Sequence, residues 1–359
     1  MKLPKAKKLN IEIYEAGPSL LGKKPAEIKL SSNESALGPS PRAIKEYNKI
    51  SKDLKRYPTE DNSLKTILAK KFKLDSKRII LGAGSDQILE LICKAFLNKG
   101  DEVVVPEFSF IVYRIYSKIN GAKVISAKEN KLIISVKNIL SLITKKTKIV
   151  FLANPNNPTG TYISKKNLLD LRRKLRSNIL LVVDDAYFEY VKKKDYNSGL
   201  ELFSKSNNVI VTRTFSKVYG LAGLRIGWGY ASKQIIESLK KIKPPFNISR
   251  PALFAASASI LDNYWLKKEI KHVYKWRKIM LKKLNNMNIE TKEGNANFLL
   301  INFNKLRINS IKVFNELKKS GILVRKMNTY GIKNSLRITI GKANENRKLI
   351  LKLRKIINV

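Results

Sequence analysis

An apolar run leads directly into a turn rich in Asn, Pro and Gly in the stretch Ile149-Val150-Phe151-Leu152-Ala153-Asn154-Pro155-Asn156-Asn157-Pro158-Thr159-Gly160. Residues 149–152 would be apolar on both faces of a strand, which is typical of a strand covered on both sides. The turn at 154–160 is longer than one chain reversal needs, and Asn157 offers a side-chain amide close to the strand end. The stretch therefore predicts a buried strand with a polar loop at its carboxyl end.

The same alternation extends outward in both directions, from about Lys77 to Gly229. Short apolar runs end in Gly, Pro or Asn and are followed by longer amphipathic stretches. Strands are predicted at 79–81, 103–105, 124–125, 149–152, 179–183 and 209–211, and helices at 85–98, 109–120, 137–143 and 164–176. Buried strands separated by helices indicate an α/β fold, with a mostly parallel central sheet and helices on both faces.

The pattern changes after Pro244-Pro245. A charged amphipathic stretch predicts a long helix from about 250 to 285. A strand at 297–303, a helix at 309–320, strands at 322–326 and 335–340 and a terminal helix follow. This α+β order indicates a second, smaller domain. We expect a large domain at 28–250 and a small domain made of 1–27 and 251–359.

The composition is strongly basic, with 72 Lys+Arg against 28 Asp+Glu among 359 residues and a net charge of +44. Such a charge raises the hypothesis of nucleic-acid binding. The lysines, however, are spread along the chain without a basic tail or a nucleic-acid-binding motif, and Ile and Asn are abundant too. A genome-wide bias toward A/T-rich codons explains all three, so no nucleic-acid partner is expected. The positive field suits anionic substrates.

No apolar run approaches the roughly 18 residues that a membrane span needs, and residues 1–10 lack an apolar signal-peptide core. A cytoplasmic protein without a membrane partner is expected. Cys93 is the only cysteine, which excludes an intramolecular disulfide, and its apolar surroundings predict a core position. His272, the only histidine, lies in a Lys-rich segment where a surface position is expected. A histidine-based catalytic triad and a metal site are therefore not expected.

A second polar cluster follows a strand in Val182-Val183-Asp184-Asp185-Ala186-Tyr187. A buried carboxylate is costly unless it is paired. A helix N-cap would account for Asp185. Asp184 would still need a cationic or N–H partner.

The third cluster is Thr212-Arg213-Thr214-Phe215-Ser216-Lys217, followed by Gly220-Leu221-Ala222-Gly223-Leu224-Arg225-Ile226-Gly227. A single lysine in a Lys-rich chain is by default a solvated side chain. Lys217 differs because hydroxyl side chains flank it and the glycines after it let backbone approach a ligand closely. We expect all three clusters to meet where the parallel strands end.

Together these motifs, in this order, resemble the pyridoxal 5′-phosphate (PLP)-dependent aminotransferases of fold type I, class I/II. The resemblance runs from about residue 28 to the C-terminus. Within the group it is greatest to the histidinol-phosphate aminotransferases, through Leu30-Ser31-Ser32-Asn33-Glu34-Ser35, Arg56-Tyr57-Pro58, Gly82-Ala83-Gly84-Ser85-Asp86 and Leu336-Arg337-Ile338-Thr339-Ile340-Gly341. PLP is the cofactor that the resemblance implies.

The resemblance implies a role for each residue around the cofactor ring. Lys217 would bind PLP covalently and move the proton during catalysis. Asp184 would pair with the ring nitrogen and keep it protonated. Asn157 and Tyr187 would hydrogen-bond the 3′ oxygen, and Tyr187 would thereby assist catalysis. Phe110 would stack on the ring face, with Phe108 as a rival for that role.

The cofactor phosphate would lie at the turn Gly84-Ser85-Asp86, where a helix N-terminus favours an anion. Thr214, Ser216 and Arg225 would add donors. Tyr57 would reach the phosphate across the interface of a homodimer.

At the substrate end, the resemblance implies Arg337 as the main anion anchor and Arg325 as a second contact. Asn33 would line the entrance, and Asn157 would also face the substrate. The implied reaction interconverts L-histidinol phosphate and 2-oxoglutarate with imidazole-acetol phosphate and glutamate, in histidine biosynthesis. Alternatives are an aromatic or aspartate-type aminotransferase, a lyase like threonine-phosphate decarboxylase, and a nucleic-acid-binding protein that keeps an inactive transferase fold.

Two features depart from the family pattern. Asp185 stands where glutamate is commoner, at a position not expected to touch PLP. Residues Glu15-Ala16-Gly17-Pro18-Ser19-Leu20 fit only loosely, and that stretch helps to close over the substrate. The departures leave the cofactor site intact and concern mainly the substrate.

Overall fold

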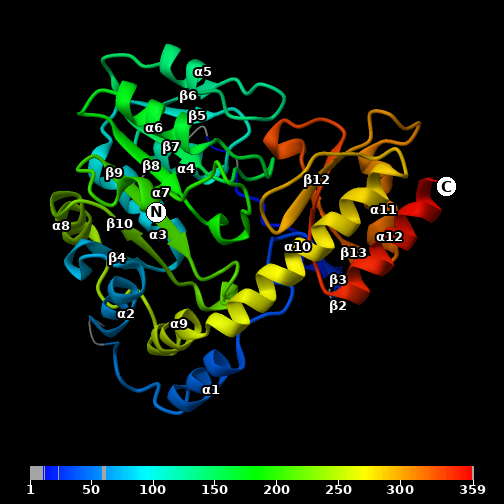
Figure 1. The fold of residues 1–359 in the computed structure, drawn as a ribbon, viewed down its shortest axis with the longest axis horizontal. Helices are drawn as coiled ribbons and strands as arrows, with labels where there is room; N and C mark the ends of the chain where they lie inside the picture. Colours follow the sequence, from blue (N-terminus) through cyan, green and yellow to red (C-terminus); the bar gives the residue numbers. More distant parts are fainter. Residues whose placement is uncertain (1–10, 12, 23, 59–61, 358–359) are drawn as a thin grey trace, which may run out of the picture.

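The computed structural model describes residues 11, 13–22, 24–58 and 62–357. Figure 1 shows two bodies, a larger one built on a seven-stranded sheet and a smaller one built on a four-stranded sheet. The large sheet has the order β4-β10-β9-β8-β7-β5-β6. Its strands are β4 (Ile79–Gly82), β5 (Glu102–Pro106), β6 (Lys123–Ala127), β7 (Thr147–Ala153), β8 (Leu180–Asp184), β9 (Val209–Thr214) and β10 (Gly227–Tyr230).

Helices cover both faces of the large sheet because its strands are apolar on both faces. Along β5, Val104 belongs to one hydrophobic core, while Val103 and Val105 belong to another on the opposite face. The second core includes residues of α3 (Gly84–Phe96), α4 (Val112–Ile119) and α8 (Lys233–Ile242). The first includes residues of α2 (Asn62–Phe72), α5 (Val136–Ser141), α6 (Lys165–Lys174), α7 (Gly199–Phe203) and α9 (Arg250–Leu261), with α1 (Pro41–Ile50) packed beside α9. The predicted α/β fold is confirmed.

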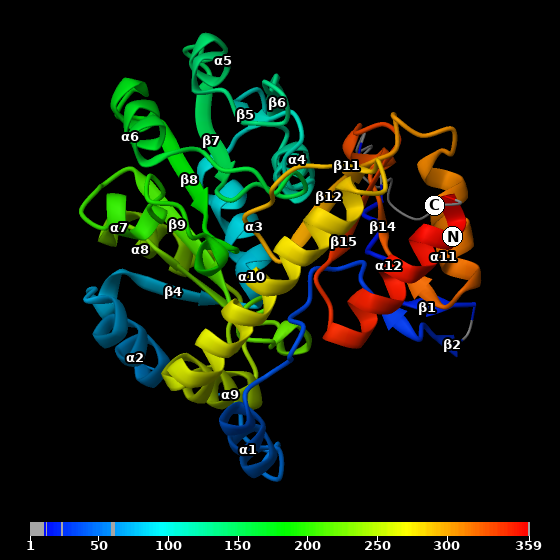
Figure 2. The same ribbon diagram turned by 45° about the vertical axis from the view of Figure 1, so that its right-hand side comes forward.

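The smaller body contains the sheet β11-β12-β15-β14, packed against three helices. The helix α10 (Asn263–Asn285) extends from the large body to the small one (Figure 2). The other strands and helices of the smaller body are β11 (Glu290–Thr291), β12 (Phe298–Asn302), β14 (Arg325–Lys326), β15 (Ser335–Thr339), α11 (Ser310–Lys319) and α12 (Ala343–Ile357). Near the N-terminus, β1 (Leu20–Leu21) pairs with β2 (Lys24–Pro25), and β3 (Ile28–Lys29) pairs with β13 (Ile322–Leu323). The domain boundaries expected near 27 and 250 stay a prediction.

Two stretches that were each predicted as one element form two elements in the structure. The stretch 250–285 is two helices, because the Asp262 side chain accepts the N–H of Trp265 and starts α10 anew. The stretch 322–326 is two short strands in different sheets, since β13 pairs with β3 and β14 pairs with β15.

The strand β10 was not predicted, and it runs antiparallel to both neighbours. Its sequence Gly-Trp-Gly-Tyr lacks the β-branched run that marked the other strands. The remaining strand pairs of the large sheet are parallel, so their carboxyl ends lie at one edge. The three polar clusters follow β7, β8 and β9 at that edge.

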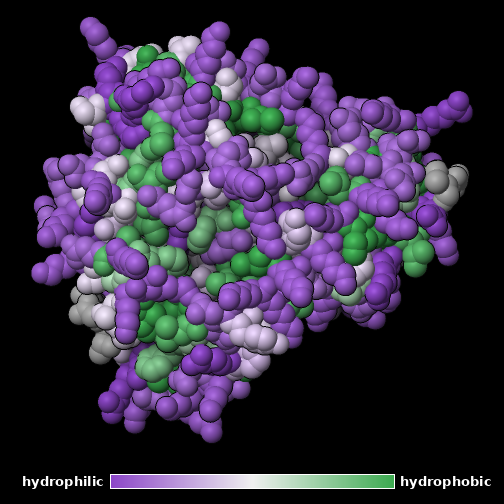
Figure 3. All heavy atoms as spheres, in the orientation of Figure 1, coloured by the Kyte–Doolittle hydropathy of each residue, from purple (hydrophilic) through white to green (hydrophobic). Residues whose placement is uncertain are grey.

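Cys93 is buried in the core, as predicted. His272 is half-buried and lies outside the cavity wall, and its Nε2 is 2.9 Å from the carbonyl oxygen of Gly341. Hydrophilic side chains cover most of the face in Figure 3 without gathering in one area. Within the described ranges, no helix is long and apolar enough to span a membrane.

Candidate active site

A cavity of about 260 Å³ lies at the carboxyl edge of the large sheet, and both bodies contribute to its wall. Thirteen of the residues singled out from the sequence line it: Asn33, Ser85, Asp86, Phe110, Asn157, Asp184, Tyr187, Thr214, Ser216, Lys217, Arg225, Arg325 and Arg337. They come from segments far apart in the chain, and the parallel arrangement of the strands brings them to one place.

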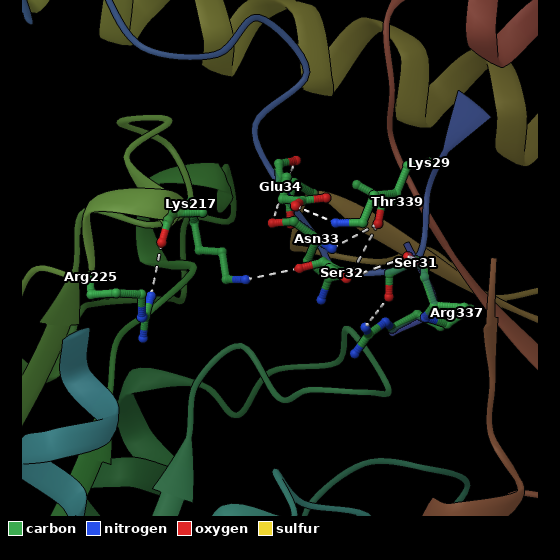
Figure 4. Close-up of polar contacts among 12 residues, drawn as sticks. Lys29, Ser31, Ser32, Asn33, Glu34, Lys217, Arg225, Arg337 and Thr339 are labelled. Atoms are coloured by element: carbon green, nitrogen blue, oxygen red, sulfur yellow. Dashed lines mark hydrogen bonds and ion pairs between the residues drawn. The ribbon is translucent and has the colours of Figure 1, made fainter. Parts of the chain in front are cut away.

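Lys217 reaches into this cavity from the loop after β9. Its Nζ donates to the carbonyl oxygen of Ser32 at 3.2 Å, and Figure 4 shows it between Arg225 on one side and Arg337 on the other. Burial, and after it the charge of Arg337, lower the pKa of the Lys217 amine from 10.5 to about 8. An amine with this pKa is available as a nucleophile and base close to neutral pH.

Asp184 ends β8 and is only 5% exposed. Its Oδ2 accepts the hydroxyl proton of Tyr113 at 2.7 Å, and its Oδ1 accepts the N–H of Ala186 at 3.2 Å. Burial raises the pKa of this carboxyl to about 6, while the hydrogen bond from Tyr113 lowers it. Among the described residues, none forms an ion pair with Asp184, although it faces the cavity. The backbone N–H of Ala186 is thus the N–H partner expected from the sequence, and no cationic partner lies among the described residues.

A second group of donors surrounds the N-terminus of α3. Gly84 has φ +76°, and a Cβ there would lie 2.4 Å from Nη2 of Arg225, so only glycine lets the arginine pass this close. The Arg225 Nη1 donates to Oγ of Ser216 at 3.2 Å, and its Nη2 lies 3.6 Å from Asp86. Free N–H groups, a hydroxyl and a guanidinium together form a site suited to a phosphate group.

Arg325 and Arg337 form a third group, on the opposite side of Lys217 from Arg225. They lie directly opposite each other on the antiparallel strands β14 and β15, and they are only 7% and 5% exposed. Like charges in such a cross-strand pair repel each other. Partners of Arg337 include Asn157 Oδ1 at 2.5 Å and the carbonyl oxygen of Ser31 at 3.1 Å, neither of which carries a charge. Two buried guanidinium groups in one wall favour an anion between them.

The remaining polar side chains of the wall are tied to one another. Tyr187 is 4% exposed, and its hydroxyl accepts from Nδ2 of Asn33 at 3.0 Å. Burial raises the pKa of Tyr187 to about 12. Phe110 lines the cavity, whereas Phe108 packs in a separate cluster with Met327 and other residues. The structure thus favours Phe110 over Phe108 as the ring beside a bound ligand.

Two other residues from the sequence analysis lie outside the cavity wall. Tyr57 is 76% exposed and stacks on Phe246, with ring centroids 4.6 Å apart. Asp185 does not cap a helix that follows it directly. Its Oδ1 accepts the N–H of Gly199, the first residue of α7, and its Oδ2 lies 3.7 Å from the buried Arg213. Asp185 does not line the cavity.

The part of the chain that the structure describes holds no group of three or more His, Cys, Asp or Glu side chains placed to bind a metal ion.

The model of the aminotransferase class I and II family matches residues 25–353. The chain belongs to this family. Among curated relatives, the histidinol-phosphate aminotransferase of Pelagibacter ubique is 47% identical, with all of both chains covered. That of Paramagnetospirillum magneticum is 39% identical over 97% of each chain.

Solved structures of other aminotransferases have a similar fold. The histidinol-phosphate aminotransferase of Sinorhizobium meliloti, in complex with pyridoxal-5′-phosphate, has a TM-score of 0.90 at 24% identity and covers 96% of this chain and 95% of its own. An aspartate aminotransferase of Thermus thermophilus has a TM-score of 0.83 at 18% identity, with 92% of each chain covered. At these identities the likeness concerns the fold alone.

Several residues of this aminotransferase's cavity had no role in the sequence analysis: Tyr14, Ser32, Glu34, Tyr113 and Tyr330. Tyr113 follows Phe110 by three positions, a spacing that brings two side chains to the same face of a helix. That spacing could have identified it. Tyr14 directly precedes the stretch 15–20, and Tyr330 lies between Arg325 and Arg337, but neither belongs to a motif that pointed to the cavity.

Proposed function

We propose that this chain is a PLP-dependent aminotransferase that interconverts L-histidinol phosphate and 2-oxoglutarate with imidazole-acetol phosphate and glutamate, in histidine biosynthesis. The observation that carries the proposal is the position of Lys217 between two separate groups of anion-binding side chains, one at Arg225 and one at Arg325 and Arg337. A cofactor phosphate would occupy the first and a substrate anion the second. The full-length relatives named for this substrate support the choice among aminotransferases.

The residues at the Arg225 side fit the cofactor phosphate. The space that a Cβ at Gly84 would fill is kept open, and the Arg225 guanidinium borders it. Ser85, Thr214 and Ser216 line the same cavity and bring hydroxyl donors. Asp86 would contribute through its position at the helix N-terminus, since its carboxylate itself would repel a phosphate.

The residues around Asp184 fit the cofactor ring. A protonated pyridine nitrogen would give this buried carboxylate the cationic partner that the described protein residues lack. Asn157 and Tyr187 would bind the 3′ oxygen, and Phe110 would lie against the ring face. When bound, PLP supplies an electron sink for the charge that develops at the substrate carbon.

Lys217 would hold the cofactor covalently between turnovers and act as the proton carrier during them. Its Nζ can take the proton from the substrate carbon that bears the amino group, because a pKa of about 8 leaves about a tenth of the amine uncharged at pH 7, far more than for an ordinary lysine. Arg325 and Arg337 would orient the substrate through its anionic end. A guanidinium donates two parallel hydrogen bonds to a phosphate ester or to a carboxylate in the same bidentate geometry. One site can therefore serve both half-reactions.

The functional unit in this proposal is a homodimer located in the cytoplasm, where both substrates are metabolites. Exposed apolar side chains gather on α1, α9 and the segments next to them, over the area near α9 that is apolar in Figure 3. They are Ile44, Tyr47, Leu54, Tyr57, Phe246, Phe254, Leu261 and Tyr264. A second copy of the chain would cover this surface and place Tyr57 at its neighbour's phosphate site. Sedimentation equilibrium tests the assembly, and a monomer at micromolar concentration would refute it.

A screen of half-reactions tests the function. The purified holoenzyme is mixed with histidinol phosphate, phenylalanine, aspartate or threonine phosphate, and the visible absorbance of the cofactor is followed in single turnovers. We expect histidinol phosphate to remove the visible band fastest, with 2-oxoglutarate restoring it. Faster turnover of phenylalanine or aspartate would assign another aminotransferase activity, and release of carbon dioxide from threonine phosphate would assign a lyase.

Capture of PLP by the cofactor-free protein should depend on the protonation of Lys217. Burial and Arg337 both disfavour its ammonium form, so the amine loses its proton as the pH rises through about 8 instead of 10.5. The rate at which the visible band appears after PLP is added should therefore rise with pH, with a midpoint near 8. A lysine-containing peptide measured in parallel controls for the titration of PLP itself. A midpoint near that of the peptide would contradict the environment described for Lys217.

A further inference from the structure

Tyr113 lies on α4 in the wall of the cavity, and its side chain contacts the carboxylate of Asp184 directly. Its ring is fully buried and stacks on Phe151, with centroids 4.8 Å apart and planes at 6°. Its hydroxyl donates to Oδ2 of Asp184 at 2.7 Å. The ring is thus fixed by packing, and the hydroxyl has one defined acceptor.

The carboxylate of Asp184 depends on few donors. Besides the Tyr113 hydroxyl, the N–H of Ala186 reaches Oδ1 at 3.2 Å, and the side chain of Thr212 also lowers the pKa of this carboxyl. Burial works against the charged form of this carboxyl and raises its pKa, while the hydrogen bond from Tyr113 acts in the opposite direction. A donor of this kind stabilises the ionised form in a buried site.

Tyr113 is also linked to the ring that borders the cavity. The rings of Phe110 and Tyr113 meet edge to face, with centroids 5.7 Å apart and an interplanar angle of 89°. The N–H of Tyr113 donates to the carbonyl oxygen of Phe110 at 3.2 Å. One residue therefore contacts both the carboxylate and the aromatic ring that face a ligand in the cavity.

We propose that Tyr113 is a positioning residue that keeps Asp184 ionised and oriented toward the cofactor ring nitrogen, and that sets the place of Phe110 against the ring. This inference rests on the proposed function, because it requires Asp184 to face the ring nitrogen. Tyr113 acts through Asp184 and Phe110 and need not touch the cofactor. A buried tyrosine hydroxyl with a partner can also serve stability alone, so the test has to separate the two roles.

The test compares Tyr113→Phe with Tyr116→Phe in the holoenzyme. Tyr116 lies on the same helix and loses the same atom, but it does not line the cavity. The first readout is the pH titration of the visible cofactor band. Without the Tyr113 hydroxyl, Asp184 is less readily ionised, so the ring nitrogen of the cofactor is less often protonated. The pKa read from the titration of the visible band should therefore rise by about half a unit or more.

The second readout is the single-turnover rate with amino donor. We expect about a tenfold fall in the maximal rate for Tyr113→Phe, the order of effect for one hydrogen bond to a charged group, with little change in the donor concentration at half-maximal rate. The other charged groups of the cavity wall, Glu34, Asp86, Lys217, Arg225, Arg325 and Arg337, are unchanged in this variant. Tyr116→Phe should match the unaltered protein in both readouts.

A double variant links the effect to Asp184. In Tyr113→Phe/Asp184→Asn the visible band should titrate as in Asp184→Asn alone. Once the carboxylate is gone, removing the Tyr113 hydroxyl should have no further effect on the titration. A further shift in the double variant, or a wild-type titration in Tyr113→Phe, would overturn the role of Tyr113. An unaltered protein that forms no visible band with PLP would instead overturn the proposed function.

Discussion

Lys217→Ala is expected to abolish the visible cofactor band and to lower the rate of transamination by about four orders of magnitude or more. The variant removes both the covalent attachment point and the amine that carries the proton. Its neighbours Arg225 and Arg337 remain, so PLP should still bind noncovalently through its phosphate. The absorbance spectrum with PLP and the single-turnover rate with histidinol phosphate measure the two losses.

Lys233→Ala provides the matched control, because Lys233 is an exposed lysine at the start of α8. It should keep the band and the rate of the unaltered protein. If Lys217→Ala retained the visible band, another amine would hold the cofactor and the assignment of Lys217 would be wrong.

Arg337→Ala is expected to reduce kcat/KM for the amino donor and for 2-oxoglutarate alike, each by about a hundredfold or more. The reason is that one buried guanidinium would orient the anionic ends of both substrates. The visible band should persist, because Lys217, Asp184 and the residues near Arg225 are untouched. Steady-state kinetics with each substrate varied in turn measure the effect.

Arg337→Lys and Arg307→Ala complete the experiment. Arg337→Lys keeps the positive charge but loses the bidentate pair of guanidinium donors, so we expect partial activity. Arg307 is exposed and belongs to the same part of the chain, and its removal should have no effect. Unchanged kinetics in Arg337→Ala would mean that the substrate anion lies elsewhere, with Arg325 the first alternative.

The cross-strand pair of arginines explains why the substrate end was harder to predict than the cofactor end. In the sequence, Arg325 is one basic residue among many. Its importance comes from the register that places it opposite Arg337 with both side chains buried. This register cannot be predicted from a local sequence pattern, because it depends on the pairing between strands of the small body.

The parallel sheet was predictable for the opposite reason. Its strands are apolar at consecutive positions, such as Val103, Val104 and Val105, because helices cover both faces. The polar clusters after three of these strands lie at one edge as a direct consequence of parallel pairing. The short strands β10, β13 and β14 were missed or merged because their pairing partners, and not their own composition, make them strands.

Local sequence patterns were enough to predict the α/β class, the order of the buried strands and the residues at their ends, including Lys217, Asp184 and Asn157. These follow from local periodicity and from motifs, which do not depend on distant segments. Three features became visible only in the folded chain: Tyr113 donates to Asp184, Phe110 and not Phe108 faces the cavity, and two arginines share one wall. Those contacts join residues far apart in the chain, and the free energy that favours them arises from packing and burial, which no local stretch of sequence contains.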